Sequence, residues 1–151
     1  MLESLLAPPF AADPPVKVNV PAKTLGLILA ILGAIGALFG IFGVFALLGL
    51  SAVAAAYGGI FLLAVIGVII GEIGTVVGAW GGYQMYQEKR EGKKLAIYGV
   101  LVNVVGSLIA AIGGSGGLAG WIFGALISFV IYYLIVISRF PGEPPLVATT
   151  A

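Results

Sequence analysis

Glu72 is the residue whose type and surroundings most suggest chemistry within an apolar part of this sequence. It is the only acid or base across residues 24–87, and residues 95–138 contain none. In a helix it would lie roughly 21 Å from Tyr86, near the middle of a bilayer. An acid at that depth costs about 2.5 to 3.5 kcal/mol unless it is neutral or paired. No Lys or Arg is expected at that depth, so Glu72 must be protonated, hydrogen-bonded or paired with a base from another subunit.

Two interpretations of Glu72 follow from that cost. In the functional one, the carboxyl group binds a proton or a cation. In the structural one, it is a neutral acid held by hydrogen bonds, and we favour it because transport machinery usually shows more than one polar group along its path. The candidate hydrogen-bonding groups are Thr75, Asn103, Ser107 and Tyr132. At 100° per residue, Glu72 faces away from Gly71 and Gly74, toward the other side of the bundle, a partner or lipid.

The composition excludes most enzymatic and cofactor chemistry. The chain has no Cys and no His, so it lacks thiolate or imidazole ligands for zinc, copper, haem or iron–sulfur clusters and the usual nucleophile–base pairs. The formal net charge of +1 provides no field that would attract nucleic acid. We therefore expect a protein that is not an enzyme, with no catalytic residue, no metal, no cofactor and no nucleic-acid partner.

The balance of apolar and charged residues indicates an integral membrane protein. Apolar residues make up 61% of the 151 residues and charged residues only 9%, whereas a soluble domain usually has about 25% charged residues. One crossing needs about 20 helical residues, so each of the two apolar blocks holds two, with breaks at 49–52 and 113–117. The predicted fold is an all-α polytopic bundle of four transmembrane helices. Their expected ranges are 25–48, 53–86, 95–112 and 118–138.

The seven basic residues all flank those segments on one side of the membrane. The positive-inside rule assigns that side, with both termini, to the cytoplasm of a multi-pass protein in the cell (inner) membrane. We expect a Pro-rich cytoplasmic arm at 1–22, the transmembrane domain at 23–140 and a Pro-rich cytoplasmic tail at 141–151. The loop between the second and third helices either binds anionic lipid headgroups or only sets the topology. Its basic residues are Lys89, Arg90, Lys93 and Lys94.

Glycines recur at steps of three and four within the expected helices, and the chain has 24 of them. This spacing places small residues along one side of each helix, and in lipid such residues let helices approach closely. We expect them to pack helix against helix in an antiparallel, glycine-rich bundle. The glycines expected to pack are Gly33, Gly36, Gly40, Gly43, Gly67, Gly71, Gly74, Gly78, Gly99, Gly106, Gly120 and Gly124.

Three short segments carry a resemblance to a class of proteins. They are Trp80-Gly81-Gly82-Tyr83, Gly92-Lys93-Lys94, and the stretch from Tyr132-Tyr133 to Arg139. In these features the chain resembles small uncharacterised four-helix bacterial integral membrane proteins. The resemblance covers the helical part and implies no activity.

The small residues that line one side of each helix, named here the small-residue seams, and the lack of catalytic groups lead to a first functional hypothesis. We expect a non-catalytic accessory or scaffold subunit that packs against a larger membrane complex or against itself, with membrane lipids and other membrane subunits as its partners. The alternative is a small proton-coupled transporter or channel that works through Glu72.

Overall fold

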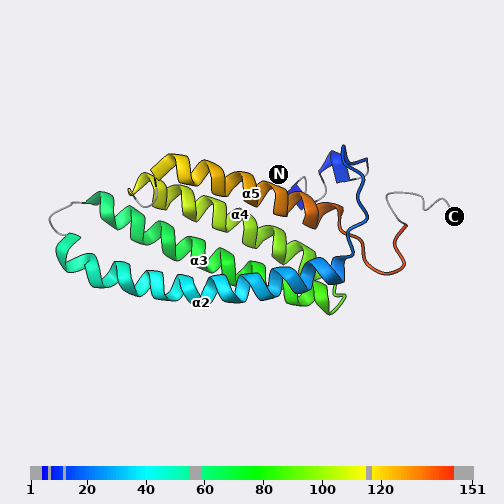
Figure 1. The fold of residues 1–151 in the computed structure, drawn as a ribbon, viewed down its shortest axis with the longest axis horizontal. Coiled ribbons are helices and arrows are strands. Elements are labelled where there is room, and N and C mark those ends of the chain that lie inside the picture. Colours follow the sequence, from blue (N-terminus) through cyan, green and yellow to red (C-terminus); the bar gives the residue numbers. More distant parts are fainter. Residues whose placement is uncertain (1–4, 7, 12, 55–58, 115–116, 145–151) are drawn as a thin grey trace.

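The regular structure of the fold is almost entirely helical in the part of the chain that the structure describes. A computed structural model describes residues 5–6, 8–11, 13–54, 59–114 and 117–144. It contains a short 3-10 turn and four long α-helices (Figure 1). The elements are η1 (Pro9–Ala11), α2 (Ala22–Ala54), α3 (Gly59–Tyr86), α4 (Glu91–Ile112) and α5 (Gly117–Ile137). Each of these four α-helices is long and apolar enough to cross a membrane. The expected all-α architecture with four membrane-length helices is thereby confirmed for the described residues.

The helix boundaries differ from those expected at two connections. The break expected at 49–52 is absent, because α2 continues to Ala54. A single Gly49 between leucines costs a helix only about 1 kcal/mol, which the surrounding strong helix formers offset. The second helix therefore begins at Gly59, and its 28 residues are shorter than the expected segment. The third helix begins earlier than expected, at Glu91. Residues 55–58 and 115–116 lie outside the described residues.

Each helix packs on the next one in sequence. The most extensive contact joins α3 to α4; α2 packs against α3, and α5 packs against α4, while α2 and α5 scarcely touch. Figure 1 shows α3 and α4 between the two outer helices. One end of the bundle, named here the termini end, holds the start of α2, the end of α5 and the α3–α4 connection. The opposite end, where α2 ends and α5 begins, is named the far end.

Glycines provide the contact between α3 and α4. A Cβ atom built on Gly67, Gly74 or Gly81 of α3 would overlap the α4 backbone, at Ala110, Asn103 and Ala96 respectively. Residue numbers therefore fall along α4 as they rise along α3. The α4 glycines at 92, 99 and 106 face the α3 backbone in the same way. Because there is little hydrophobic gain from helix contact in lipid, this close van der Waals approach is the interaction that holds such a pair together.

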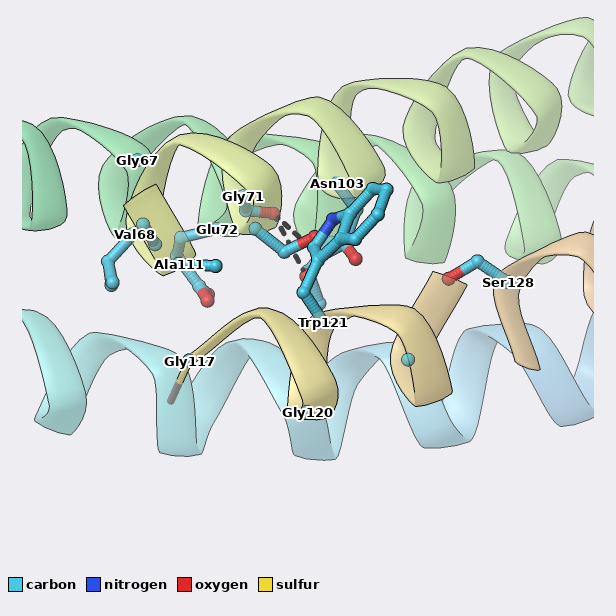
Figure 2. Close-up of a pocket in the computed structure, with 14 residues that line it drawn as sticks. Gly67, Val68, Gly71, Glu72, Asn103, Ala111, Gly117, Gly120, Trp121 and Ser128 are labelled. Atoms are coloured by element: carbon cyan, nitrogen blue, oxygen red, sulfur yellow. Dashed lines mark hydrogen bonds between the residues drawn. The ribbon is translucent and has the colours of Figure 1, made fainter. Parts of the chain in front are cut away.

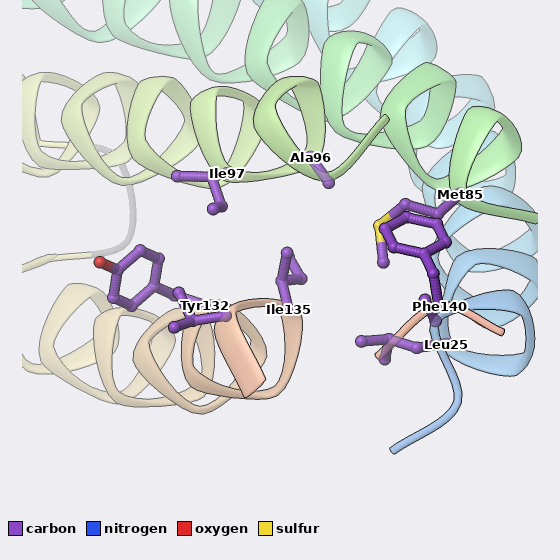
Figure 3. Close-up of a cluster of buried hydrophobic side chains, with 9 residues drawn as sticks. Leu25, Met85, Ala96, Ile97, Tyr132, Ile135 and Phe140 are labelled. Atoms are coloured by element: carbon purple, nitrogen blue, oxygen red, sulfur yellow. The ribbon is translucent and has the colours of Figure 1, made fainter. Parts of the chain in front are cut away.

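Large buried side chains gather at the termini end. Met85, Ile97 and Ile135 are fully buried and belong to one cluster with Leu25 and its neighbours (Figure 3). The ammonium group of Lys93 donates to the carbonyl oxygens of Val136, at 2.7 Å, and Ser138, at 3.0 Å. These carbonyls belong to the last turn of α5 and the residues just after it, where they have no partner within the helix. Lys93 therefore joins the start of α4 to the end of α5.

The N-terminal arm lies along α5 at the same end. The Phe10 ring stacks on Tyr133, with ring centroids 5.7 Å apart. The hydroxyl of Tyr132 donates to the carbonyl of Leu5 at 2.6 Å, and that of Tyr133 donates to the carbonyl of Val16 at 2.8 Å. The arm residues Leu6, Phe10, Ala11 and Val20 pack against the buried cluster. The described part of the arm therefore covers the termini end.

Candidate functional site

The site begins with a pocket that contains Glu72. The pocket has a volume of about 500 Å³ and lies between α3, α4 and α5 toward the far end (Figure 2). We name it the Glu72 pocket. Its polar lining residues are Glu72, Thr75, Asn103, Ser107, Trp121 and Ser128. Glycines of α3 and α5 form much of the remaining wall, and Glu72 is the only acid or base among the described lining residues. The pocket thus combines one carboxyl group with neutral polar groups and small apolar walls.

Glu72 reaches from α3 toward α2 along one side of this pocket. One carboxylate oxygen, Oε2, occupies the space that a side chain at Gly40 of α2 would need. The other oxygen, Oε1, is buried and has no hydrogen-bond partner among the described residues. The residue as a whole is partly exposed. Of the directions that the helical angle allowed for Glu72, the structure places it toward the other side of the bundle, against α2.

The hydroxyl and amide groups expected near Glu72 bond elsewhere. The Asn103 amide donates to the carbonyl of Gly71 at 3.0 Å and to the hydroxyl of Thr75 at 2.9 Å. The Thr75 hydroxyl donates to the same carbonyl at 3.1 Å. This network links α4 to α3 next to the pocket.

The other two candidate partners also bond elsewhere. The Ser107 hydroxyl donates to the carbonyl of Val104 in its own helix, at 2.9 Å. The fourth candidate, Tyr132, is bonded to the N-terminal arm. The hydrogen bonds of these groups therefore leave Oε1 of Glu72 without a partner within the described structure.

Trp121 forms the aromatic wall of the pocket. Its indole nitrogen donates to the carbonyl of Val104 at 3.3 Å. This hydrogen bond holds the Trp121 ring, which belongs to α5, against α4. Trp121 lines this pocket together with Glu72 and Asn103 (Figure 2). Sequence reasoning missed Trp121 and Ser128 as pocket residues, because a tryptophan near a helix end is typical of an aromatic belt. The available signal was the spacing of Trp121, Gly124 and Ser128 at steps of three and four, which puts them on one face.

A second pocket continues from the first toward the termini end. Its volume is about 240 Å³, and the two pockets share Thr75, Asn103 and Ser128 in their linings. The second one is mostly apolar and extends to Ile135, which belongs to the fully buried cluster. The Asn103–Thr75 hydrogen bond therefore lies where the two pockets meet, and the buried cluster of the termini end lies beyond them.

The glycines expected to pack fall into two groups. A Cβ atom built on most of them would meet another helix: Gly33, Gly36, Gly40, Gly67, Gly71, Gly74, Gly78, Gly99 and Gly106. Within the described structure, no atom of another element lies within 4 Å of a Cβ built at Gly43, Gly120 or Gly124. The packing expected of these three is therefore not seen. Gly120 and Gly124 line the Glu72 pocket instead.

The four basic residues of the loop have different environments. Lys93 is turned inward to the end of α5, so its ammonium group faces carbonyl oxygens of the protein and not lipid headgroups. Arg90 lies 3.8 Å from the carboxylate of Glu143. Lys89 and Lys94 are exposed. The unpaired carbonyls at the α5 terminus attract the ammonium group of Lys93, and the headgroup contact expected of the four basic residues stays a prediction.

The described residues contain no group of three or more His, Cys, Asp or Glu side chains that could hold a metal ion.

Comparison of the chain with protein-family models, curated proteins and solved structures gave no match.

Proposed function

We propose that this chain is a small multi-pass protein of the cell membrane that binds a proton or a cation at Glu72 and carries it across the bilayer. In this proposal α2 to α5 form an antiparallel, glycine-rich transmembrane bundle with both termini in the cytoplasm. The bundle itself is non-catalytic. The function is that of a small proton-coupled transporter or channel.

The observation that carries the proposal is the buried, unpartnered oxygen of Glu72 at the wall of a pocket. An ionised carboxylate without a partner in a low-dielectric region is strongly disfavoured. The group is therefore stable only with a bound proton or beside a cation. A carboxyl group with these two alternatives next to an open pocket is the basic element of a proton or cation exchanger.

Polar groups along the path also support transport. Asn103, Thr75, Ser107 and Ser128 lie in the same pocket as Glu72, and three of these lining residues also border the second pocket. A path for a proton or a cation requires polar groups in addition to the acid, whereas a lone structural acid does not.

The position of the charges supports the proposed orientation. The N-terminal side of α2, the α3–α4 connection and the segment after α5 meet at one end, through the Lys23–Glu88 pair at 2.9 Å and the Arg90–Glu143 pair at 3.8 Å. All seven basic residues of the chain belong to these segments, the arm and the start of α4. The positive-inside rule then favours the cytoplasm for this end.

The accessory-subunit function is the second candidate. Its original support was the small-residue seams, but most of those glycines pack within the chain itself. What still favours it is the far half of α2, where Phe39, Phe42 and Phe45 are all more than 60% exposed and Gly43 has no close neighbour among the described residues. Lipid covers such a surface as well as a partner does, so this observation weighs less than the pocket.

Flux measurements on reconstituted protein test the proposal. Liposomes holding a pH-sensitive dye would receive the full chain or the Glu72→Gln variant, with a potassium gradient and valinomycin to set the membrane potential. Glu91→Gln is the matched control, because Glu91 is an exposed acid at the start of α4. We expect proton flux with the natural sequence and with Glu91→Gln, and its loss with Glu72→Gln. The transport function would be refuted if all three proteins gave equal proton flux. It would also be refuted if the natural sequence gave no more flux than empty liposomes with every solute and gradient applied.

A further inference from the structure

We infer that the cation taken up by the Glu72 pocket is a monovalent organic cation with an apolar body, exchanged for one proton on Glu72. This inference rests on the proposed function and specifies the class of its substrate. It is carried by the size of the pocket, its single charge and its aromatic wall.

The size of the pocket argues against a bare ion. A volume of about 500 Å³ lies within the range of small-molecule sites, about 300 to 1,000 Å³. One water molecule takes about 30 Å³ in the liquid, so a proton or a metal ion would leave most of this space empty or filled with water. An organic molecule fills it.

The charge of the pocket sets the charge of the ligand. Glu72 is the only acid or base that lines it among the described residues. Its oxygen Oε1 is buried and has no partner there. One positive charge on the ligand would neutralise this carboxylate, while a second would remain unpaired in a low-dielectric region. The ligand is therefore a monocation.

The walls of the pocket favour an apolar ligand body over a small inorganic ion. The indole of Trp121 lines the same pocket as Glu72 and is held against α4 by its hydrogen bond to Val104. An aromatic ring attracts an organic cation that lies over its face. The Asn103 amide is already bonded to Gly71 and Thr75. Dehydration of a metal ion requires several oxygen ligands that converge on it, and these side chains are bonded to one another instead.

The exchange conserves charge in a simple way. In the empty pocket, Glu72 carries a proton. When the cation enters, the O–H bond of the carboxyl group breaks, the proton leaves to water, and the carboxylate pairs with the cation. One proton is released for each cation bound, and the reverse step releases the cation.

Binding of radiolabelled tetraphenylphosphonium to the purified full chain in detergent tests this inference. We expect saturable binding of one cation per chain, with release of one proton recorded by a pH dye in weak buffer. The neutral compound triphenylphosphine oxide should not compete. Binding should weaken at least tenfold in Glu72→Gln and several-fold in Trp121→Leu, and remain unchanged in Glu91→Gln and Trp80→Phe. Glu91 and Trp80 are exposed and lie outside the pocket lining.

A second variant keeps the test decisive if Glu72→Gln fails to fold. Gly120→Phe adds a ring to a wall residue that has no close neighbour in the described structure, so it should fill the pocket, block binding and leave the elution volume in size-exclusion chromatography unchanged. Unchanged binding in a folded Gly120→Phe variant would overturn the inference. So would equal binding in Glu72→Gln, or an absence of saturable binding to the natural sequence. If proton flux in liposomes still depends on Glu72 while tetraphenylphosphonium does not bind, the proposed transport function stands and the organic-cation inference fails.

Discussion

The inner helices α3 and α4 and the outer helix α5 use glycine in opposite ways. Toward the termini end, Gly81, Gly92 and Gly99 bring α3 and α4 into backbone contact, and large side chains fill the space beside them. Toward the far end, Gly120 and Gly124 of α5 meet no other element among the described residues and leave a pocket open. Gly67 and Gly106 make the same α3–α4 backbone contact toward the far end. Glycine therefore closes the space between α3 and α4, named here the closed half, and leaves the pocket beside α5, named the open half, free of side chains. The difference depends on whether a second helix lies opposite, which the spacing of glycines does not encode.

The largest expected effect comes from a side chain added to the closed half. In Gly99→Val, the new Cβ would overlap the backbone of Gly78, and neither helix can yield without separation of α3 from α4. We expect a loss of at least about 3 kcal/mol in stability, recorded as a fall in the melting temperature of the detergent-solubilised protein. Gly124→Val, in the open half, should change stability by no more than about 0.5 kcal/mol. Equal losses in the two variants would show that the halves do not differ in packing.

The next largest effect concerns the link between α4 and α5 at the termini end. Lys93→Met removes two charge-assisted hydrogen bonds to the end of α5. The carbonyl oxygens of Val136 and Ser138 then lose this donor. We expect a loss of about 2 kcal/mol in stability, measured by the same thermal assay. Lys94→Met is the matched control, because Lys94 is exposed, and it should have no measurable effect. A larger loss in Lys94→Met than in Lys93→Met would contradict this role.

A smaller effect is expected where α2 meets the pocket. In Gly40→Val, the new side chain would occupy the place of the Glu72 carboxylate, which can rotate away because it is the end of a flexible chain. We expect tetraphenylphosphonium affinity to fall about tenfold, which corresponds to about 1.4 kcal/mol, while the melting temperature stays nearly constant. Gly43→Val, on the same helix with no close neighbour in the described structure, should bind normally. Normal tetraphenylphosphonium binding by Gly40→Val would show that the position of the Glu72 carboxylate does not matter for binding.

The smallest effect should come from the arm on α5. Tyr133→Phe removes the hydroxyl that donates to the carbonyl of Val16 and accepts from its amide, at 2.8 and 3.1 Å. We expect a loss of about 1 kcal/mol in the attachment of the arm, seen as cleavage at Lys17 by trypsin that is several-fold faster. The control is Tyr83→Phe, on exposed α3 surface, which should leave the cleavage rate unchanged. If both variants are cleaved at the natural rate, the hydroxyl of Tyr133 does not hold the arm.

The position of Glu72 shows how far local sequence information reaches. Its isolation in an apolar segment was predictable, and the structure places it within α3, which is long and apolar enough to cross a membrane. Its depth in a bilayer stays a prediction. The sequence also identified Thr75, Asn103 and Ser107 as polar groups near that depth. It could not reveal that these groups bond to α3 or to their own helix, because each has several partners of equal chemical quality and the approach of α4 selects among them.

Lys93 and Trp121 mark the limit of that information. A basic residue in a loop and a tryptophan near a helix end both have common surface functions in a membrane protein. Here Lys93 turns to the end of α5, and Trp121 turns to α4. Their partners are distant in sequence, so only the packed arrangement of the helices brings the bonding groups within reach.

The sequence by itself determined that the chain is helical, that four helices are long and apolar enough to cross a membrane, and that one acid lies deep within them. These properties depend on local periodicity, length and charge, which each segment of the sequence has whether or not it packs against another helix. The tertiary structure alone decided which glycines close the bundle and which line a pocket, and which oxygen of Glu72 stays without a partner. These properties depend on contacts between helices, and a contact requires two surfaces whose relative position no local pattern specifies.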